Sequence, residues 1–94
     1  MALEFVVRLR LLKEPEGGRS TPIRSGYRGL MRFGAADAEL AFGVQIDFES
    51  DRLQPGEVAE VSVRTWSDEN PLAPPMTDVF LYEGGKLVGT GSVR

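Results

Sequence analysis

Four arginines stand within residues 17–36, at Arg19, Arg24, Arg28 and Arg32, and no acidic residue accompanies them. Guanidinium groups bind phosphates and carboxylates through paired N–H donors, so this stretch could hold RNA or an acidic protein surface. The chain as a whole has a net charge of −3, and its other 7 basic residues are outnumbered by 14 acidic ones. Positive charge is therefore concentrated in one stretch, and such segregation matters more for recognition than the total charge.

The same arginines could instead hold loops together. Arg19 and Arg28 lie beside glycines, where a guanidinium can cap loop carbonyls or pair with Glu14, Glu16 or Glu83. Tyr27 is the only aromatic residue between Arg19 and Arg32, which is a small set for stacking on RNA bases. The structural role and the phosphate-binding role both remain open from the sequence.

The residue types that usually perform catalysis are scarce. The 94 residues include no cysteine and no histidine, which removes disulfides, thiolate metal sites and the commonest general base. Asp47, Glu49 and Asp51 alternate along one predicted strand, which favours a solvated face over a cation site. The glycine-rich segments resemble a phosphate-binding loop only superficially, because Lys86 precedes Leu87 and no helix follows. We therefore expect no catalytic residue, no metal site, no cofactor and no nucleotide binding.

Apolar residues recur at every second position in several segments, which is typical of strands with one buried face. Gly84 and Gly85 mark a hairpin, residues 53–57 form a Pro-Gly turn, and residues 87–93 are the last predicted strand. No segment has a sustained helical period, so the sequence predicts one all-β domain over residues 1–94, a small six-stranded antiparallel β-barrel. The predicted interior consists of Phe5, Val7, Leu9, Val44, Ile46, Val61, Val63, Val79 and Leu81.

Three motifs in this order indicate a family. They are "EGGRSTPIRSGYR" (residues 16–28), "LQPGE" (residues 53–57) and "FLYEGGKLVGTG" (residues 80–91). Together they resemble the third, C-terminal domain of elongation factor Tu, which is a six-stranded antiparallel barrel. The resemblance covers nearly the whole chain and is weakest over residues 34–49. It implies a free-standing copy of that domain, without the nucleotide-binding domain that carries the family's GTPase activity.

The resemblance also implies a site. In the family, the motif positions of Arg19, Arg28, Glu83 and Gly84 lie along the surface that meets the T arm of aminoacyl-tRNA. We therefore expect Arg19 and Arg28 on one side of the barrel, near the hairpin at Glu83 and Gly84, with Arg24 and Arg32 as further RNA or partner contacts. Two features depart from the family: Ser20 replaces a histidine, and Gly29-Leu30 replaces Pro-Gln.

Three aromatic residues form a second candidate surface. Val79 and Leu81 take the inward positions of their strand, which leaves Phe80 and Tyr82 on the opposite face, close to Trp66. Exposed aromatic residues often form the centre of a protein interface. In the alternative reading, the proline-rich loop at residues 67–76 folds over them and they form a small cluster within the domain.

These observations favour a non-catalytic binding module that binds another protein or a second copy of itself. The alternative is a module that binds tRNA or another structured RNA, and an enzyme is a distant third. The apolar runs are too short for a membrane-spanning helix, and the first residues lack the pattern of a signal peptide. We expect a cytoplasmic protein with no membrane partner.

Overall fold

The computed structural model describes residues 4–66, 71 and 73–94. Strands dominate it, and the single helical element among the described residues is the short 3-10 turn η1 (Glu14–Glu16). The strands are β1 (Glu4–Leu11), β2 (Ile23–Arg24), β3 (Tyr27–Phe33), β4 (Phe42–Asp47), β5 (Arg52–Leu53), β6 (Val58–Thr65), β7 (Asp78–Glu83) and β8 (Lys86–Val93).

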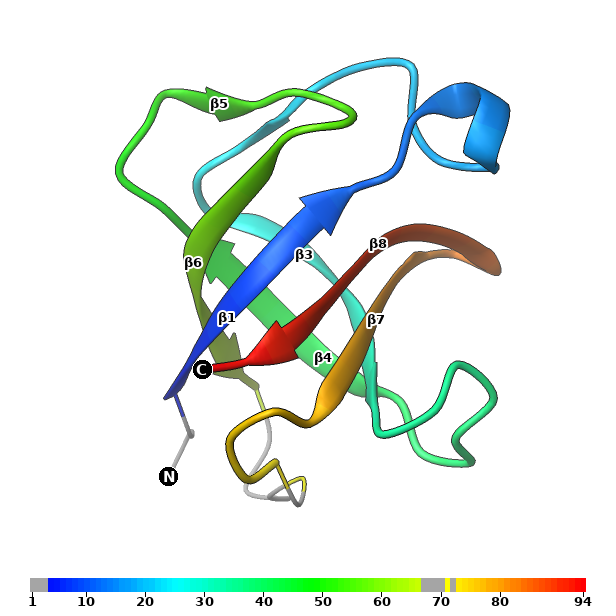
Figure 1. The fold of residues 1–94 in the computed structure, drawn as a ribbon, viewed down its shortest axis with the longest axis vertical. Helices are drawn as coiled ribbons and strands as arrows, with labels where there is room; N and C mark the ends of the chain where they lie inside the picture. The colour runs from blue at the N-terminus through cyan, green and yellow to red at the C-terminus, as the bar shows by residue number, and fades with distance from the viewer. Residues whose placement is uncertain (1–3, 67–70, 72) are drawn as a thin grey trace.

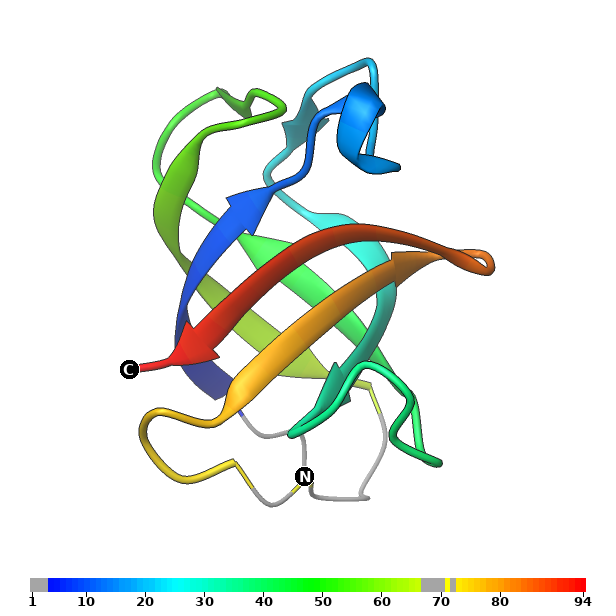
Figure 2. The same cartoon turned by 45° about the vertical axis from the view of Figure 1, so that its right-hand side comes forward.

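Six of the strands close into a barrel in the order β1-β6-β4-β3-β7-β8, and every neighbouring pair is antiparallel (Figures 1 and 2). The predicted all-β class and the six-stranded barrel are therefore confirmed. The two-residue strands β2 and β5 pair with each other outside the barrel, near its upper end in Figure 1.

The alternation of side chains places the core. Eight of the nine predicted interior residues are buried, and Phe5 is the exception, because it lies near the start of β1 and is only partly covered. Its ring packs against that of Phe33 at 5.7 Å between centroids. The core also contains Leu11, Ile23, Met31, Phe42, Leu53, Val88 and Val93.

Glycine allows β8 to approach β1 closely. A Cβ atom on Gly91 would lie 2.1 Å from the carbonyl oxygen of Arg8, far inside van der Waals contact. Gly91 pairs with Leu9 in the register of these strands, so the close approach lies within the barrel wall. Any side chain at this position must push the first and last strands apart.

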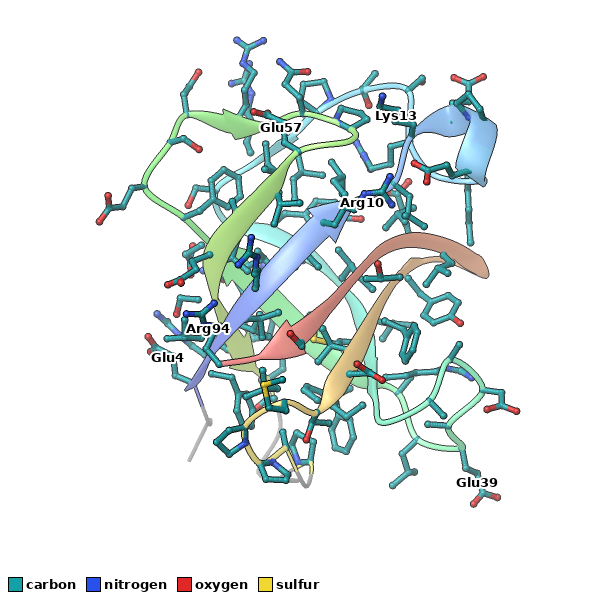
Figure 3. The ribbon with its side chains drawn as sticks, in the orientation of Figure 1. Glu4, Arg10, Lys13, Glu39, Glu57 and Arg94 are labelled. Atoms are coloured by element: carbon teal, nitrogen blue, oxygen red, sulfur yellow. The ribbon has the colours of Figure 1, made fainter. Side chains whose placement is uncertain are left out.

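The turn η1 is fixed to the barrel by charge. Both carboxylate oxygens of Glu16 accept hydrogen bonds from Arg10 on β1, at 2.9 and 2.8 Å, and one also accepts from the Lys13 N–H. These bonds hold the pKa of Glu16 below its usual range. Arg10 and Lys13 lie close to this turn in Figure 3.

Within the described residues, no helix is long and apolar enough to cross a membrane.

Candidate partner-binding face

Arg19 holds two segments of the chain together, an arrangement that we call the Arg19 lock, and each of its three guanidinium nitrogens donates a hydrogen bond. Its Nη1 pairs with Glu83 at the end of β7, its Nε donates to the Thr21 carbonyl at 3.1 Å, and its Nη2 donates to Thr21 Oγ1 at 3.0 Å. The side chain is only 18% exposed. The expected proximity of Arg19 to Glu83 is therefore present, and the contacts are those of a residue that ties the segment before β2 to the β7–β8 hairpin.

Tyr27 completes this lock. Its hydroxyl donates to Glu83 Oε1 at 2.6 Å, and the Arg19 guanidinium lies 5.5 Å from its ring centroid. Burial, followed by the hydrogen bond to the Glu83 carboxylate and its charge, raises the pKa of Tyr27 to about 12. The phenol stays protonated because ionisation would place a second negative charge beside Glu83.

This pKa can be measured in a Tyr82→Phe variant, where Tyr27 is the remaining tyrosine of the two in the chain. We expect absorbance at 295 nm to titrate near pH 12. An unfolded tyrosine has a pKa of about 10, so the stability that Tyr27 contributes is complete below that pH and is lost as pH rises from about 10 to 12. Glu83→Gln should lower the midpoint, though not fully, because burial remains. A midpoint near 10 before that change would contradict this account.

Arg28 has a different partner. Its guanidinium lies 4.4 Å from the ring centroid of Trp66, which follows β6 and is 51% exposed. The indole rests over Gly43 of β4, where an added Cβ would come within 2.8 Å of the ring. The backbone N–H of Trp66 donates a hydrogen bond to the Gly43 carbonyl at 3.0 Å, and this bond fixes the position of the residue that carries the ring.

Arg32 forms a second stack of the same kind. Its guanidinium lies 5.2 Å from the ring centroid of Tyr82, and the Tyr82 hydroxyl donates to the Ala36 carbonyl at 2.7 Å. The Arg32 Nε is buried and has no hydrogen-bond partner among the described residues. Neither Arg28 nor Arg32 forms an ion pair within residues 4–66, 71 and 73–94.

Leu30 lies between the two stacks. It pairs with Tyr82 on one side and with Gly43 on the other, and its side chain is 42% exposed. A row across the outer surface thus runs from β7 through β3 and β4 to the end of β6. We call this surface the Arg–aromatic face and define it as Arg28, Leu30, Arg32, Trp66, Phe80 and Tyr82.

The three residues of the predicted aromatic patch lie on the outer surface, and the patch as an interface stays a prediction. Phe80 and Tyr82 do face outward and are half-buried, opposite Arg32 and Leu30 in the register with β3. No ring contact joins Trp66, Phe80 and Tyr82 within the described residues, since arginines lie against two of the rings. The predicted cover by the proline loop falls largely outside the described residues, at 67–70 and 72.

The remaining predicted residues lie elsewhere. Gly84 forms the β7–β8 turn in a left-handed conformation, with a φ of 62°. Arg24 is exposed on β2, directly opposite Arg52 on β5. The four arginines of the basic stretch therefore divide between the Arg19 lock, the two stacks and the outer ribbon.

The sequence analysis did not identify Leu30 as part of this surface or Gly43 as the residue beneath the Trp66 ring. The available signal was the departure from the family at Gly29-Leu30, which places an apolar side chain at an outward strand position. In the described part of the chain, no group of three or more acidic, histidine or cysteine residues could hold a metal ion. Asp47 instead accepts hydrogen bonds from the Gln45 amide at 3.1 and 3.2 Å.

Comparison with known proteins supports a resemblance to elongation factor Tu. No protein-family model matches the chain. Over 89 residues, or 95% of its length, the chain is 34% identical to elongation factor Tu 2 of Streptomyces avermitilis. The chain is similar to an elongation factor over the length of a domain. It spans about a fifth of the length of this curated relative, since the matched segment is 22% of that protein.

Proposed function

We propose that this chain is a non-catalytic binding module that corresponds to the third domain of elongation factor Tu and binds a protein partner through the Arg–aromatic face. The observation that carries the proposal is the pair of arginine–aromatic stacks on either side of the exposed Leu30. Similarity to an elongation factor supports a role related to translation and a place in the cytoplasm.

The composition of the face favours a protein partner. Tryptophan, tyrosine and arginine are the residues most enriched where binding energy concentrates in protein interfaces. Stacking holds each guanidinium in place before binding, so less side-chain entropy is lost when a partner docks. Arg28 and Arg32 have no carboxylate partner in the described structure, so the complementary surface should offer acidic groups around an apolar centre. A second copy of this acidic chain could supply such groups.

RNA binding is the alternative, and the engagement of Arg19 weakens it. A guanidinium that already donates to Glu83 and Thr21 must break those bonds to reach a phosphate. Arg24, Arg28 and Arg32 remain available, but affinity for RNA grows with the number of phosphates contacted. Three arginines on two separate surfaces are a small footprint for an acidic protein.

Site-specific photo-crosslinking tests the proposal. A photoreactive amino acid in place of Leu30 should give a discrete protein adduct in an extract of the cells that make the protein. A dimer adduct would identify self-association. The matched control places the same group at Glu14, an exposed residue of η1 outside the Arg–aromatic face, where no such adduct should form.

The adduct should survive ribonuclease and disappear when Arg28 and Arg32 are both changed to glutamate. Loss of the adduct on ribonuclease treatment would support the RNA alternative instead. Equal adducts from positions 30 and 14 would refute a role for the face.

A further inference from the structure

We propose that the groove between the end of β4 and the first half of β6 binds an extended segment of a partner protein, with alternating apolar and basic side chains, as an added strand. This site lies apart from the Arg–aromatic face. The inference goes beyond the proposed function and does not depend on it.

The groove exists because β4 leaves β6 early. Their pairing ends where Asp47 lies opposite Ser62, while β6 extends back to Val58. The next residue, Phe48, donates its backbone N–H to Ser25 Oγ at 2.9 Å, and the Gly26 N–H donates to the Ile46 carbonyl at 2.8 Å. The turn before β3 therefore holds the end of β4 and draws it away from β6.

The first half of β6 consequently has a neighbour on one side only. Residues 58–61 pair with β1, and no second strand pairs with them in the described part of the chain. Successive residues of a strand direct their backbone groups to opposite neighbours. The Trp66 N–H donates to Gly43 on β4, and the Glu57 carbonyl accepts from Leu11 at the end of β1. Even-numbered residues thus face the β4 side, so the backbone groups of Val58 and Glu60 point into the groove.

The space beside this edge is a cavity of about 670 Å³, open to solvent. Its apolar lining comes from Val6, Phe48, Ala59 and Val61. A second hollow of about 240 Å³ is lined by Arg8 of β1 together with Val58, Ala59 and Glu60 of β6. An unpaired strand edge beside apolar pockets is the arrangement that accepts a peptide by strand addition: the backbone provides affinity and the pockets select side chains.

The carboxylates that line the cavity determine which polar side chains a bound peptide should carry. Asp47 and Glu49 line the cavity together with Glu60. Glu60 pairs with Arg94 at 3.6 Å, and Asp47 accepts hydrogen bonds from Gln45, while Glu49 forms no ion pair within the described residues. Arg94, labelled in Figure 3, lies beside the start of β1, on the same side of the barrel as Glu4. The cavity is thus negative overall, so lysine or arginine side chains complement it.

The alternation of a strand then fixes the pattern. A peptide added beside Val58 and Glu60 directs every second side chain inward, onto Ala59, Val61 and Phe48. The intervening side chains point outward, between the carboxylates of β4 and β6. The occupant is therefore an extended segment whose inward residues are apolar and whose outward residues are basic.

The test uses a capped hexapeptide of alternating lysine and valine, titrated into the isotope-labelled protein and followed by NMR. We expect amide shifts along residues 47–50 and 58–62, and slower hydrogen exchange at the Val58 and Glu60 amides. A capped hexapeptide of alternating glutamate and valine should bind at least about tenfold more weakly, because its charges repel those of the groove. A lysine–valine peptide with a central proline should also bind more weakly, since it lacks one backbone donor.

Charge reversal supplies the matched comparison. Asp47→Lys combined with Glu49→Lys should weaken the lysine–valine peptide about tenfold or more and strengthen the glutamate–valine peptide. Glu39→Lys, in the loop before β4, and Arg28→Glu, on the Arg–aromatic face, should change neither. The variant spectra themselves report whether each protein is folded. Shifts centred on Leu30 and Trp66, equal binding of both charge types, or no binding would overturn the proposal.

Discussion

Gly91→Ala should destabilise the barrel more than any conservative surface change. We expect the free energy of unfolding to fall by about 3 kcal/mol, near the upper end of the usual overpacking range, because the atom met is a backbone oxygen that cannot rotate away. The new methyl group would start 2.1 Å from the Arg8 carbonyl oxygen. For a domain of this size, the corresponding drop in Tm is roughly 12–24 °C.

Gly85→Ala is the matched control, since it makes the same chemical change on the same hairpin. A Cβ at Gly85 meets nothing within 4 Å, and this residue is outside the left-handed region. Its Tm should therefore stay within a few degrees of the parent. Equal melting curves for the two variants would show that β8 and β1 do not approach as closely as described.

Arg19→Ala and Arg28→Ala should show that Arg19 stabilises the fold and that Arg28 contributes to partner binding. Arg19→Ala removes donors to Glu83 and Thr21 in a half-buried site, so we expect a loss of about 1–3 kcal/mol in the free energy of unfolding. Arg28→Ala removes one stack on a half-exposed indole, which is worth about 0.5–1 kcal/mol. Chemical denaturation of both variants measures these values.

The effects of the two variants on crosslinking should rank in the opposite order to their effects on stability. Arg28→Ala should reduce crosslinking from position 30 severalfold while the protein remains folded, since arginine truncations at interface centres commonly cost more than 1 kcal/mol. Arg19→Ala should leave crosslinking unchanged under conditions where that variant is folded. Loss of the adduct in Arg19→Ala with normal crosslinking in Arg28→Ala would reverse the assignments made for these two residues.

The period-two pattern carried most of the fold prediction. Val7, Leu9, Val61 and Val63 are buried as the alternation requires, because one face of each barrel strand must be covered. Phe5 lies on the same face of β1 but is partly exposed, because it is close to the end of the barrel. The alternation of apolar residues does not indicate where a strand reaches that end. The β2–β5 ribbon was also missed, because a two-residue strand has no periodicity to detect.

The sequence predicted most residues of the candidate site, but it did not predict which arginine lies against which aromatic ring. The sequence identified both the basic stretch and the aromatic residues as separate surfaces. Register decides that Arg28 reaches Trp66 and that Arg32 reaches Tyr82, and register depends on contacts between segments far apart in the chain. Gly43 matters for a similar reason: it leaves room for the indole of Trp66, the residue that follows β6.

The closure of the barrel has a consequence for how the chain folds. Leu9 lies between Ala59 on β6 and Gly91 on β8, so β1 gains its neighbours only after long loops have closed. The entropy of closing those loops is lost before their contacts repay it, which places such topologies among the slower-folding small domains, in the millisecond-to-second range. During that interval β1 is an unpaired apolar edge, and the partially folded chain is most prone to aggregate there.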